Sequence, residues 1–384
     1  MTEPAASSIR SGGRAVTVAA AMIVLDEERF LGGCLESLAG VVDDIIVVDT
    51  GSRDRSVEIA AGFGARILRH EWAGDFAAAR NRALDAVGCD WVLYIDADER
   101  LRLPSGGRLC DYVRPEAVSG FVRFRPRTGY TRYREWRLFR SDPRIRFKGA
   151  IHETTVEAIR SVSALDGWPI VHTPVEIDHL GYDGDLAHKH RRNLPLLRAA
   201  VTDNPARLFL WQQLAETLAA VGEAEAARQA AWEGLQRLRP DAGDQDVASA
   251  SMIRQFLARD GLQGGIDVGA VIDEGLARLP DDHALRFLQG CHRLRRRDAA
   301  AALDIADGLL SIDPSRLCDG LLAFDARIFG DKALELAALA SLQLGHRTDA
   351  ARYFHRAAQA APANRSYRLK AVALGAGAGP SALS

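Results

Sequence analysis

The sequence lacks the features that mark several classes of protein. Its five cysteines are scattered, and no two have the spacing of a zinc site, so we expect reduced thiols and a cytoplasmic protein. The apolar run at residues 15–25 is too short to span a bilayer, and it leads into acidic residues without a signal cleavage site. The formal net charge of -2 gives the chain no strong attraction to nucleic acid or anionic lipid.

A phosphate-binding glycine loop is also missing where a dinucleotide-binding domain would have one. The first apolar strand, residues 16–24, is followed by Leu25-Asp26-Glu27-Glu28, which contains no glycine to cradle a pyrophosphate. Asp49 does end a second strand, as a ribose-binding acid would. Without the glycine loop, however, this fold class fits poorly.

Strand and helix patterns alternate over about the first hundred residues. We expect strands at 16–24, 45–48, 65–68 and 91–95, and the run at 45–48 is unbroken and apolar, as is typical of a strand buried on both faces. Helical spacing lies between them, and the third helix, residues 76–87, carries Arg80 and Asn81. Ser52 is placed to cap the second helix, with Asp54 in its first turn. This alternation predicts an α/β domain with a parallel, doubly wound sheet.

The pattern changes after residue 98. Segments 120–126, 134–140 and 170–177 alternate like strands, and from about residue 185 the chain is almost wholly helical. With 384 residues we expect two domains: an α/β domain over 15–185 and an all-α domain over 186–374, between disordered tails at 1–14 and 375–384. Weak, unevenly spaced tetratricopeptide patterns fall near Trp211, Gly234, Gly290, Ala350 and Phe354, which predicts a degenerate helical repeat.

Two carboxylates, Asp96 and Asp98, follow the fourth strand directly. Side chains alternate along a strand, so both should point the same way while Ala97 points the other. Paired carboxylates at a strand end can bind a hard divalent cation together with a phosphate. Ligands of open α/β sheets bind at this edge, although Asp-x-Asp alone is also found in ordinary acidic turns.

The combined pattern resembles a family 2 glycosyltransferase with the GT-A fold, over residues 18 to about 185. The matching segments are Met22–Glu28, Val47–Asp54, Ala79–Asn81 and Asp96–Glu99. The subgroup with a C-terminal helical-repeat domain, which includes bacterial peptide S-glycosyltransferases, looks most similar. The sequence departs from the family at Leu25 and Asp26, where relatives usually carry Lys-Asn.

The resemblance implies a role for individual residues. Glu27, Asp49, Arg80, Asn81 and Asp96 would bind the nucleotide. Asp98, with Asp96 nearby, would bind Mg²⁺ or Mn²⁺ on the diphosphate of a nucleotide-sugar, most commonly a UDP-sugar. A metal there would stabilise the charge that develops on the leaving group.

A histidine and a glutamate supply the remaining chemistry that the resemblance implies. An inverting transfer to a hydroxyl needs a general base facing the anomeric carbon, and the family favours Glu153 or His152 for this role. If the pair lies on a strand, only one of them can face the cleft. His179 would complete the metal site, although a lone histidine is more often structural.

Seven arginines lie between residues 123 and 140, interleaved with aromatic side chains. This composition could bind RNA through charge and stacking. A charged outer face of a strand explains it more simply, and arginines lining a diphosphate-sugar cleft are an intermediate reading. We therefore expect no nucleic-acid partner.

The expected function is a metal-dependent inverting glycosyltransferase whose acceptor is a peptide, a protein, a small molecule or a glycan. Helical repeats are more often partner surfaces than chemical sites, so the helical domain would bind a polypeptide acceptor or form a homodimer. The alternative is an interaction protein, built on those repeats, whose glycosyltransferase-like domain is inactive. Retention of Asp49, Asp96 and Asp98 favours the enzyme.

Overall fold

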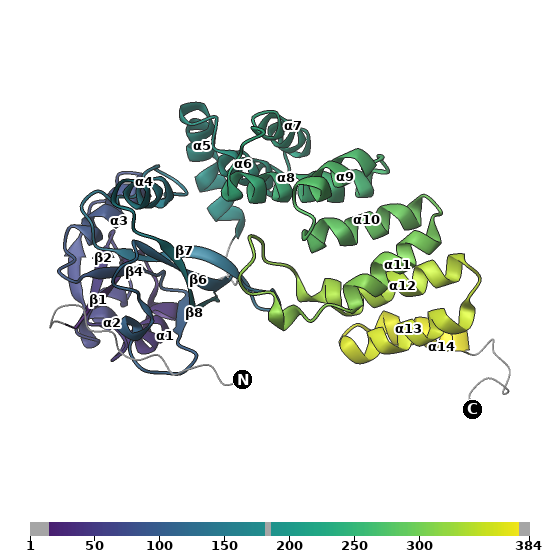
Figure 1. The fold of residues 1–384 in the computed structure, drawn as a ribbon, viewed down its shortest axis with the longest axis horizontal. Helices are drawn as coiled ribbons and strands as arrows, with labels where there is room; N and C mark the ends of the chain where they lie inside the picture. The colour runs from purple at the N-terminus through teal and green to yellow at the C-terminus, as the bar shows by residue number, and fades with distance from the viewer. Residues whose placement is uncertain (1–14, 181–185, 376–384) are drawn as a thin grey trace. The chain divides into compact units, whose positions relative to one another are not determined.

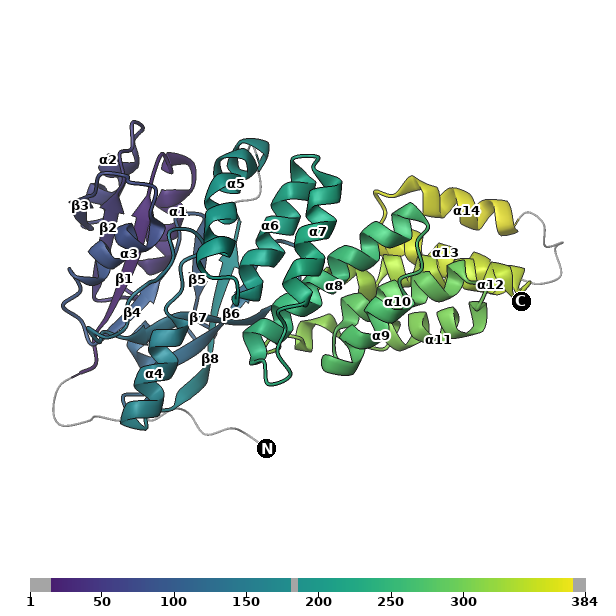
Figure 2. The same cartoon turned by 90° about the horizontal axis from the view of Figure 1, so that it is seen from above.

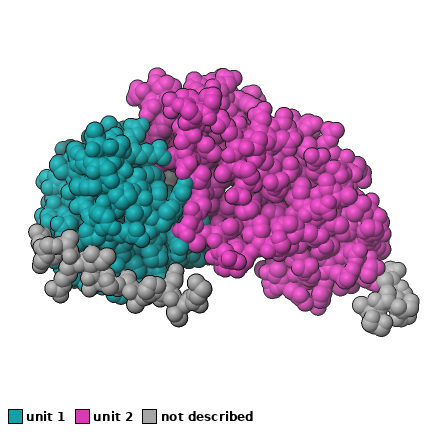
Figure 3. All heavy atoms as spheres, in the orientation of Figure 1, with its two compact units in different colours: residues 1–128, 132–186 teal, residues 129–131, 187–384 magenta. Residues whose placement is uncertain are grey.

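The computed structural model describes residues 15–180 and 186–375. The chain divides into two compact units: residues 1–128 with 132–186, and residues 129–131 with 187–384 (Figure 3). The predicted tails lie outside the described residues, apart from Gly375, which ends the last helix.

The described part of unit 1 is built on one eight-stranded mixed sheet with the order β3-β2-β1-β4-β7-β6-β8-β5 (Figure 1). β1 to β4 are parallel, as the sequence predicted, and β7 then runs antiparallel to both β4 and β6. The strands are β1 (Val18–Val24), β2 (Asp44–Asp49), β3 (Arg66–Arg69), β4 (Trp91–Tyr94), β5 (Glu99–Arg102), β6 (Ser119–Arg125), β7 (Tyr133–Arg140) and β8 (Ile170–His179).

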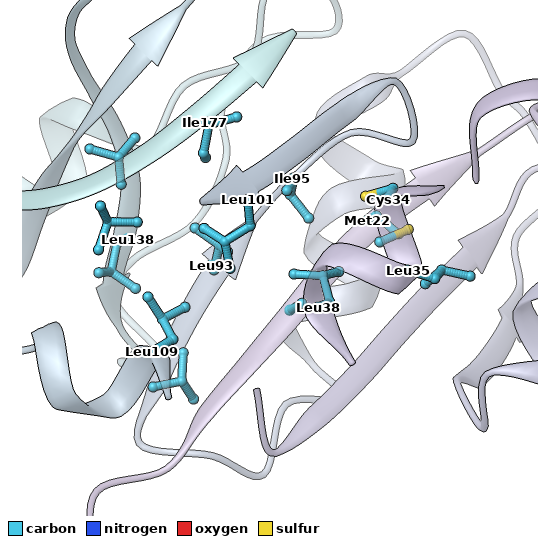
Figure 4. Close-up of a cluster of buried hydrophobic side chains, with 14 of the residues drawn as sticks. Met22, Cys34, Leu35, Leu38, Leu93, Ile95, Leu101, Leu109, Leu138 and Ile177 are labelled. Carbon is cyan, nitrogen blue, oxygen red and sulfur yellow. The ribbon is translucent and has the colours of Figure 1, made fainter. Parts of the chain in front are cut away.

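Helices cover both faces of this sheet because its central strands are apolar on both sides. One buried cluster joins alternate residues of β1 and β4 to α1 (Glu28–Leu38) and α2 (Ser56–Gly62), and Figure 4 shows Met22, Leu35 and Leu93 within it. A second cluster joins the other residues of those strands to α3 (Phe76–Leu84) and α4 (Val156–Asp166). The result is a three-layered α/β/α domain with a mixed sheet, which confirms the predicted GT-A class.

The loop after β2 holds the loop after β1. The Ser52 hydroxyl accepts a hydrogen bond from the Asp26 amide at 3.0 Å, and Asp54 accepts one from the Glu28 amide at 2.9 Å. The predicted cap at Ser52 is therefore wrong, because α2 begins only at Ser56. Asp26 has a φ of 55°, a left-handed conformation that Asp and Asn tolerate better than most residues.

The described part of unit 2 beyond the β6–β7 turn is helical, and its helices pack on their neighbours in sequence (Figures 1 and 2). None of the described helices has both the length and the apolar character needed to cross a membrane. The helices are α5 (Leu186–Asp203), α6 (Leu208–Ala220), α7 (Ala224–Leu235), α8 (Asp244–Gly264), α9 (Gly269–Arg278), α10 (His283–Arg295), α11 (Ala299–Leu310), α12 (Asp331–Gln343), α13 (Arg347–Ala360) and α14 (Arg365–Gly375), with short 3₁₀ turns η2 (Pro314–Arg316) and η3 (Ala326–Phe329).

The repeat pattern has a packing reason. A Cβ at Gly234 would lie 2.7 Å from the Trp211 Cβ, so only glycine lets α7 approach α6 this closely. Ala350 and Phe354 of α13 are likewise buried. The tetratricopeptide-like residues are thus the contact residues between adjacent helices, as expected for a helical repeat.

The turn between β6 and β7 belongs to unit 2. The Thr131 amide donates to the Phe324 carbonyl at 2.8 Å, and the Ala326 amide donates to the Gly129 carbonyl at 2.8 Å. Composition does not predict this pairing, because its two sides lie far apart in the chain. Phe324 and the Thr131 side chain, which are joined by a hydrogen bond, are 193 positions apart.

Candidate active site

The acidic residues predicted for the site lie where parallel strands end. Asp49 ends β2, and Asp96 and Asp98 follow β4. Burial alternates after β4: Ala97 and Glu99 are buried, whereas Asp96 and Asp98 are partly exposed. The predicted alternation therefore directs both aspartates away from the core.

The structure brings His179 to Asp98. The His179 Nε2 lies 3.0 Å from a carboxylate oxygen of Asp98, and Nδ1 lies 2.9 Å from the carbonyl oxygen of Pro126. The backbone amide of Leu180 also donates to the Asp98 carbonyl, which ties the end of β8 to the loop after β4. Burial alone would lower the pKa of His179, but the hydrogen bond and charge of Asp98 outweigh it and raise that pKa.

These two side chains fit a divalent cation. A proton on Nδ1 bonded to a carbonyl leaves the Nε2 lone pair of a neutral ring facing Asp98, an arrangement seen when histidine binds metal. A carboxylate oxygen and an imidazole nitrogen 3.0 Å apart could both bind one divalent cation. Among the described residues no group of three or more His, Cys, Asp or Glu side chains is arranged to hold a metal ion.

Arg80 joins Asp96 to Glu153. From α3, its Nη2 donates to Asp96 at 2.8 Å and its Nε donates to Glu153. The guanidinium lies over the rings of Tyr94 and Phe147, and the side chain is only 10% exposed. Burial would lower the pKa of Arg80, but the two carboxylates outweigh it and raise that pKa. Arg80, which the resemblance assigns to nucleotide binding, therefore also contacts Glu153, a residue expected to act as the general base.

Two further charged residues, not predicted for this site, lie beside Asp96. Arg137 of β7 donates to Glu99 at 3.0 Å and lies 3.8 Å from Asp96, while a Glu99 oxygen accepts the Asp96 amide. Burial would raise the pKa of Asp96, but Arg80 and Arg137 hold it below its ordinary value. Burial raises the pKa of Glu99 to about 7 despite Arg137. Glu99 directly follows the Asp-Ala-Asp motif, and this position in the sequence could have indicated that it belongs to the site.

His152 and Glu153 lie in a loop and not on a strand. The loop is closed by paired backbone hydrogen bonds between Lys148 and Thr154. Asn81 fastens it to α3, since its side chain donates to the Phe147 carbonyl and accepts from the Phe147 amide at 3.0 and 2.9 Å. His152 has a φ of 51°, a conformation that is uncommon outside glycine and that recurs at functional sites.

The other predicted nucleotide residues lie at the ends of β1 and β2. Asp49 is buried and accepts the Ser52 amide at 3.0 Å. Glu27 is partly buried, directly before α1, and its amide donates to the Ser56 hydroxyl at 2.7 Å. The two are near in the sheet because Asp49 pairs with Val24, three residues before Glu27.

The arginine-rich segment is largely engaged within unit 1. Arg125 and Arg132 both bind Asp178, whose side chain is only 2% exposed. Arg140 donates to the carbonyls of Pro115 and Ala117. These arginines therefore form internal ion pairs and hydrogen bonds, an arrangement that neither the charged outer face nor an RNA-binding surface had described.

Comparison with known proteins gives a family for the first half of the chain. The model of glycosyl transferase family 2 matches residues 20–165. A TPR repeat-containing protein of Synechococcus elongatus is 37% identical over 242 residues, 60% of this chain and 59% of the relative. The prophage-derived glycosyltransferase SunS of Bacillus subtilis is 27% identical over 210 residues, 51% of this chain and 48% of SunS. The chain thus spans less than two thirds of the length of either relative.

Among solved structures, glucosyl-3-phosphoglycerate synthase from Mycobacterium tuberculosis, in complex with Mn²⁺, UDP and glucosyl-3-phosphoglycerate, is 15% identical with a TM-score of 0.35. The match covers 56% of this chain and 87% of that one. The family match and the two relatives agree with the motifs at Asp49, Arg80 and Asp96 and with the mixed sheet. Residues 20–165 therefore form a family 2 glycosyltransferase domain, and a helical region similar to tetratricopeptide repeats follows it.

Proposed function

We propose that the chain is a metal-dependent inverting glycosyltransferase that takes a sugar from a nucleotide-diphosphate donor, most simply a UDP-sugar. The observation that carries the proposal is the pairing of Asp98 with His179 at the carboxyl edge of the sheet. Asp49 and Glu27, on the neighbouring strand ends, would contact the nucleoside, and the site would use Mg²⁺ or Mn²⁺.

Asp98 and His179 would hold the cation, and the hydrogen bond from His179 to Pro126 fixes the ring for this role. A bound cation would neutralise charge on the diphosphate as it leaves. Arg80 adds a buried positive charge beside Asp96. A buried guanidinium acts there with little screening by water.

Glu153 would accept the proton of the acceptor. Arg80 orients its carboxylate, and the side chain is 11% exposed, so it is sheltered without being sealed from a substrate. His152, in its left-handed conformation, shapes the same loop. A thiol acceptor would depend less on a base than a hydroxyl would, because a free thiol already has a pKa of about 8.5.

The helical region would bind a peptide or protein acceptor or a second copy of the chain. Its relative in Synechococcus elongatus is named for the same kind of repeat. Extended repeat surfaces are commonly used to bind polypeptides. This part of the proposal concerns the acceptor only, and the donor site does not depend on it.

A thermal-shift panel tests the donor site. Nucleotide diphosphates and nucleotide-sugars are added with and without Mn²⁺ to wild type and to Asp98→Ala, because ligands of the native state raise its apparent stability. We expect stabilisation by one nucleotide that requires Mn²⁺ and is absent in Asp98→Ala. No shift with any nucleotide would contradict the proposal and favour an interaction protein with an inactive domain.

A further inference from the structure

Five charged side chains alternate in sign across the candidate site. In spatial order they are Glu153, Arg80, Asp96, Arg137 and Glu99, and each one contacts the next. They come from four separate parts of unit 1: the loop after residue 147, α3, the segment after β4, and β7. The structure thus connects the predicted base to a buried glutamate through two guanidinium groups.

The proposed chemistry gives Arg137 no role of its own. Its side chain is 11% exposed and lies over the rings of Tyr94 and Phe124, at 4.5 and 4.9 Å from their centroids. Arg80 lies over the same Tyr94 ring, at 5.1 Å from its centroid. Aromatic packing therefore fixes both guanidinium groups, and their separation sets where Asp96 can lie.

Removing Arg137 would leave the carboxylates of Glu153, Asp96 and Glu99 with one guanidinium group in this row, that of Arg80. Glu99 is 1% exposed and its side chain also accepts the Asp96 amide, so Glu99 and Asp96 cannot separate freely. Without Arg137, Asp96 would keep Arg80 as its one guanidinium contact in this row and could shift, and Arg80 would then lose the carboxylate that holds its Nη2. The Nε of Arg80 binds Glu153, so this displacement would reach the base.

We propose that Arg137 is a positioning residue of this site: it holds Asp96 and Glu99, and through Asp96 and Arg80 it fixes the carboxylate of Glu153. The inference rests on the proposed function, in which Glu153 accepts the acceptor proton. Lysine cannot replace arginine here, because one ammonium cannot present a planar pair of donors to two carboxylates.

The test compares Arg137→Lys and Arg137→Met with Arg140→Met. Arg140 is the matched control, because it is also a partly buried arginine of β7 that lies over aromatic rings, yet it donates only to backbone carbonyls. Arg137→Lys keeps the positive charge and supplies a folded protein if Arg137→Met fails to fold. Each variant is assayed below its unfolding temperature for UDP release from a panel of UDP-sugars with Mn²⁺.

We expect both Arg137 variants to lose about 10- to 100-fold in kcat, the range seen when supporting residues are removed, with donor KM changed by less than about threefold. Arg140→Met should keep kcat within about twofold of wild type. A crystal structure of Arg137→Lys should show the Arg80–Glu153 contact broken or moved. Wild-type kcat in the Arg137 variants, or an equal loss in Arg140→Met, would overturn the inference.

The crystal structure separates this inference from the proposed function. If wild type turns over no nucleotide-sugar, the proposed function fails on its own. Arg80 and Glu153 unmoved in Arg137→Lys would overturn the positioning role whatever the activity.

Discussion

The Nε2 of His179 lies 3.0 Å from a carboxylate oxygen of Asp98, although 81 residues separate them in the sequence. The two meet because β5 pairs antiparallel with β8, which places Glu99 opposite His179. The sheet itself therefore assembles this part of the site.

Replacing His179 by alanine should weaken metal use without unfolding the protein. We expect Mn²⁺-supported turnover to fall at least about tenfold, because one of the two proposed protein ligands is lost. The check is a Mn²⁺ titration of turnover, with His172→Ala as the control, since His172 lies exposed on the same strand. An equal response of the two variants would contradict a metal role for His179.

Glu153→Gln should lower kcat by about 10²- to 10⁴-fold, the usual contribution of a general base, while donor binding stays unchanged. Glutamine keeps an oxygen to accept the hydrogen bond from Arg80. His152→Gly is the companion variant, because glycine adopts the left-handed conformation of residue 152 without strain. Steady-state kinetics and calorimetric donor titrations decide between them: a larger kcat loss in His152→Gly would assign the base to His152.

Asn81→Ala should destabilise the protein and slow turnover without weakening nucleotide binding. The Asn81 side chain makes two hydrogen bonds to the Phe147 backbone, and groups left unpaired cost about 1–3 kcal/mol. Urea unfolding measures this loss of stability. A large rise in the dissociation constant for UDP with unchanged stability would instead support the nucleotide contact first predicted for Asn81.

Asp282 should make the stability of the helical region depend on pH. It is fully buried, caps α10 through the Leu285 amide and accepts from Ser251 and Gln255. Burial raises the pKa of Asp282 above its ordinary 3.8, so Asp282 binds its proton more tightly in the native state than in the unfolded chain. The contribution of Asp282 to the free energy of unfolding is therefore full below its ordinary pKa, and it is lost as the pH rises through the raised pKa.

The check is the free energy of unfolding against pH for wild type and Asp282→Asn. Because asparagine does not titrate, the stability of Asp282→Asn relative to wild type should improve as the pH rises through this range. Asp282→Ala should lose about 2 kcal/mol, through the missing cap and the unpaired partners. A difference between wild type and Asp282→Asn that is constant with pH would contradict the raised pKa.

The sequence predicted the parallel half of the sheet because its signal is local. Strands buried on both faces read as unbroken apolar runs, and the acidic residues that follow them mark the carboxyl edge. The second half was harder: β5 (Glu99–Arg102) has three charged residues out of four, and its buried glutamate forms an ion pair with Arg137 of β7. A buried ion pair between distant segments leaves no periodic pattern in either one.

The candidate site shows the same difference between residues in local motifs, which could be predicted, and residues placed by distant contacts, which could not. Asp96, Asp98 and Arg80 could be predicted from motifs, whereas Arg137 lay within a segment that looked like a charged outer face. The capping role predicted for Ser52 was wrong because its hydroxyl binds the Asp26 amide of another loop. Local propensity cannot register a partner 26 positions away, and tertiary contacts decided the outcome.

The most direct test of the account is anomalous diffraction from crystals soaked with Mn²⁺ and UDP. We expect one manganese peak within coordinating distance of both Asp98 and His179, with the diphosphate of UDP as a further ligand. Asp98→Ala crystals soaked in the same way should lack that peak. Bound UDP with manganese elsewhere, or with no manganese in the wild-type crystals, would contradict a metal-dependent transferase site.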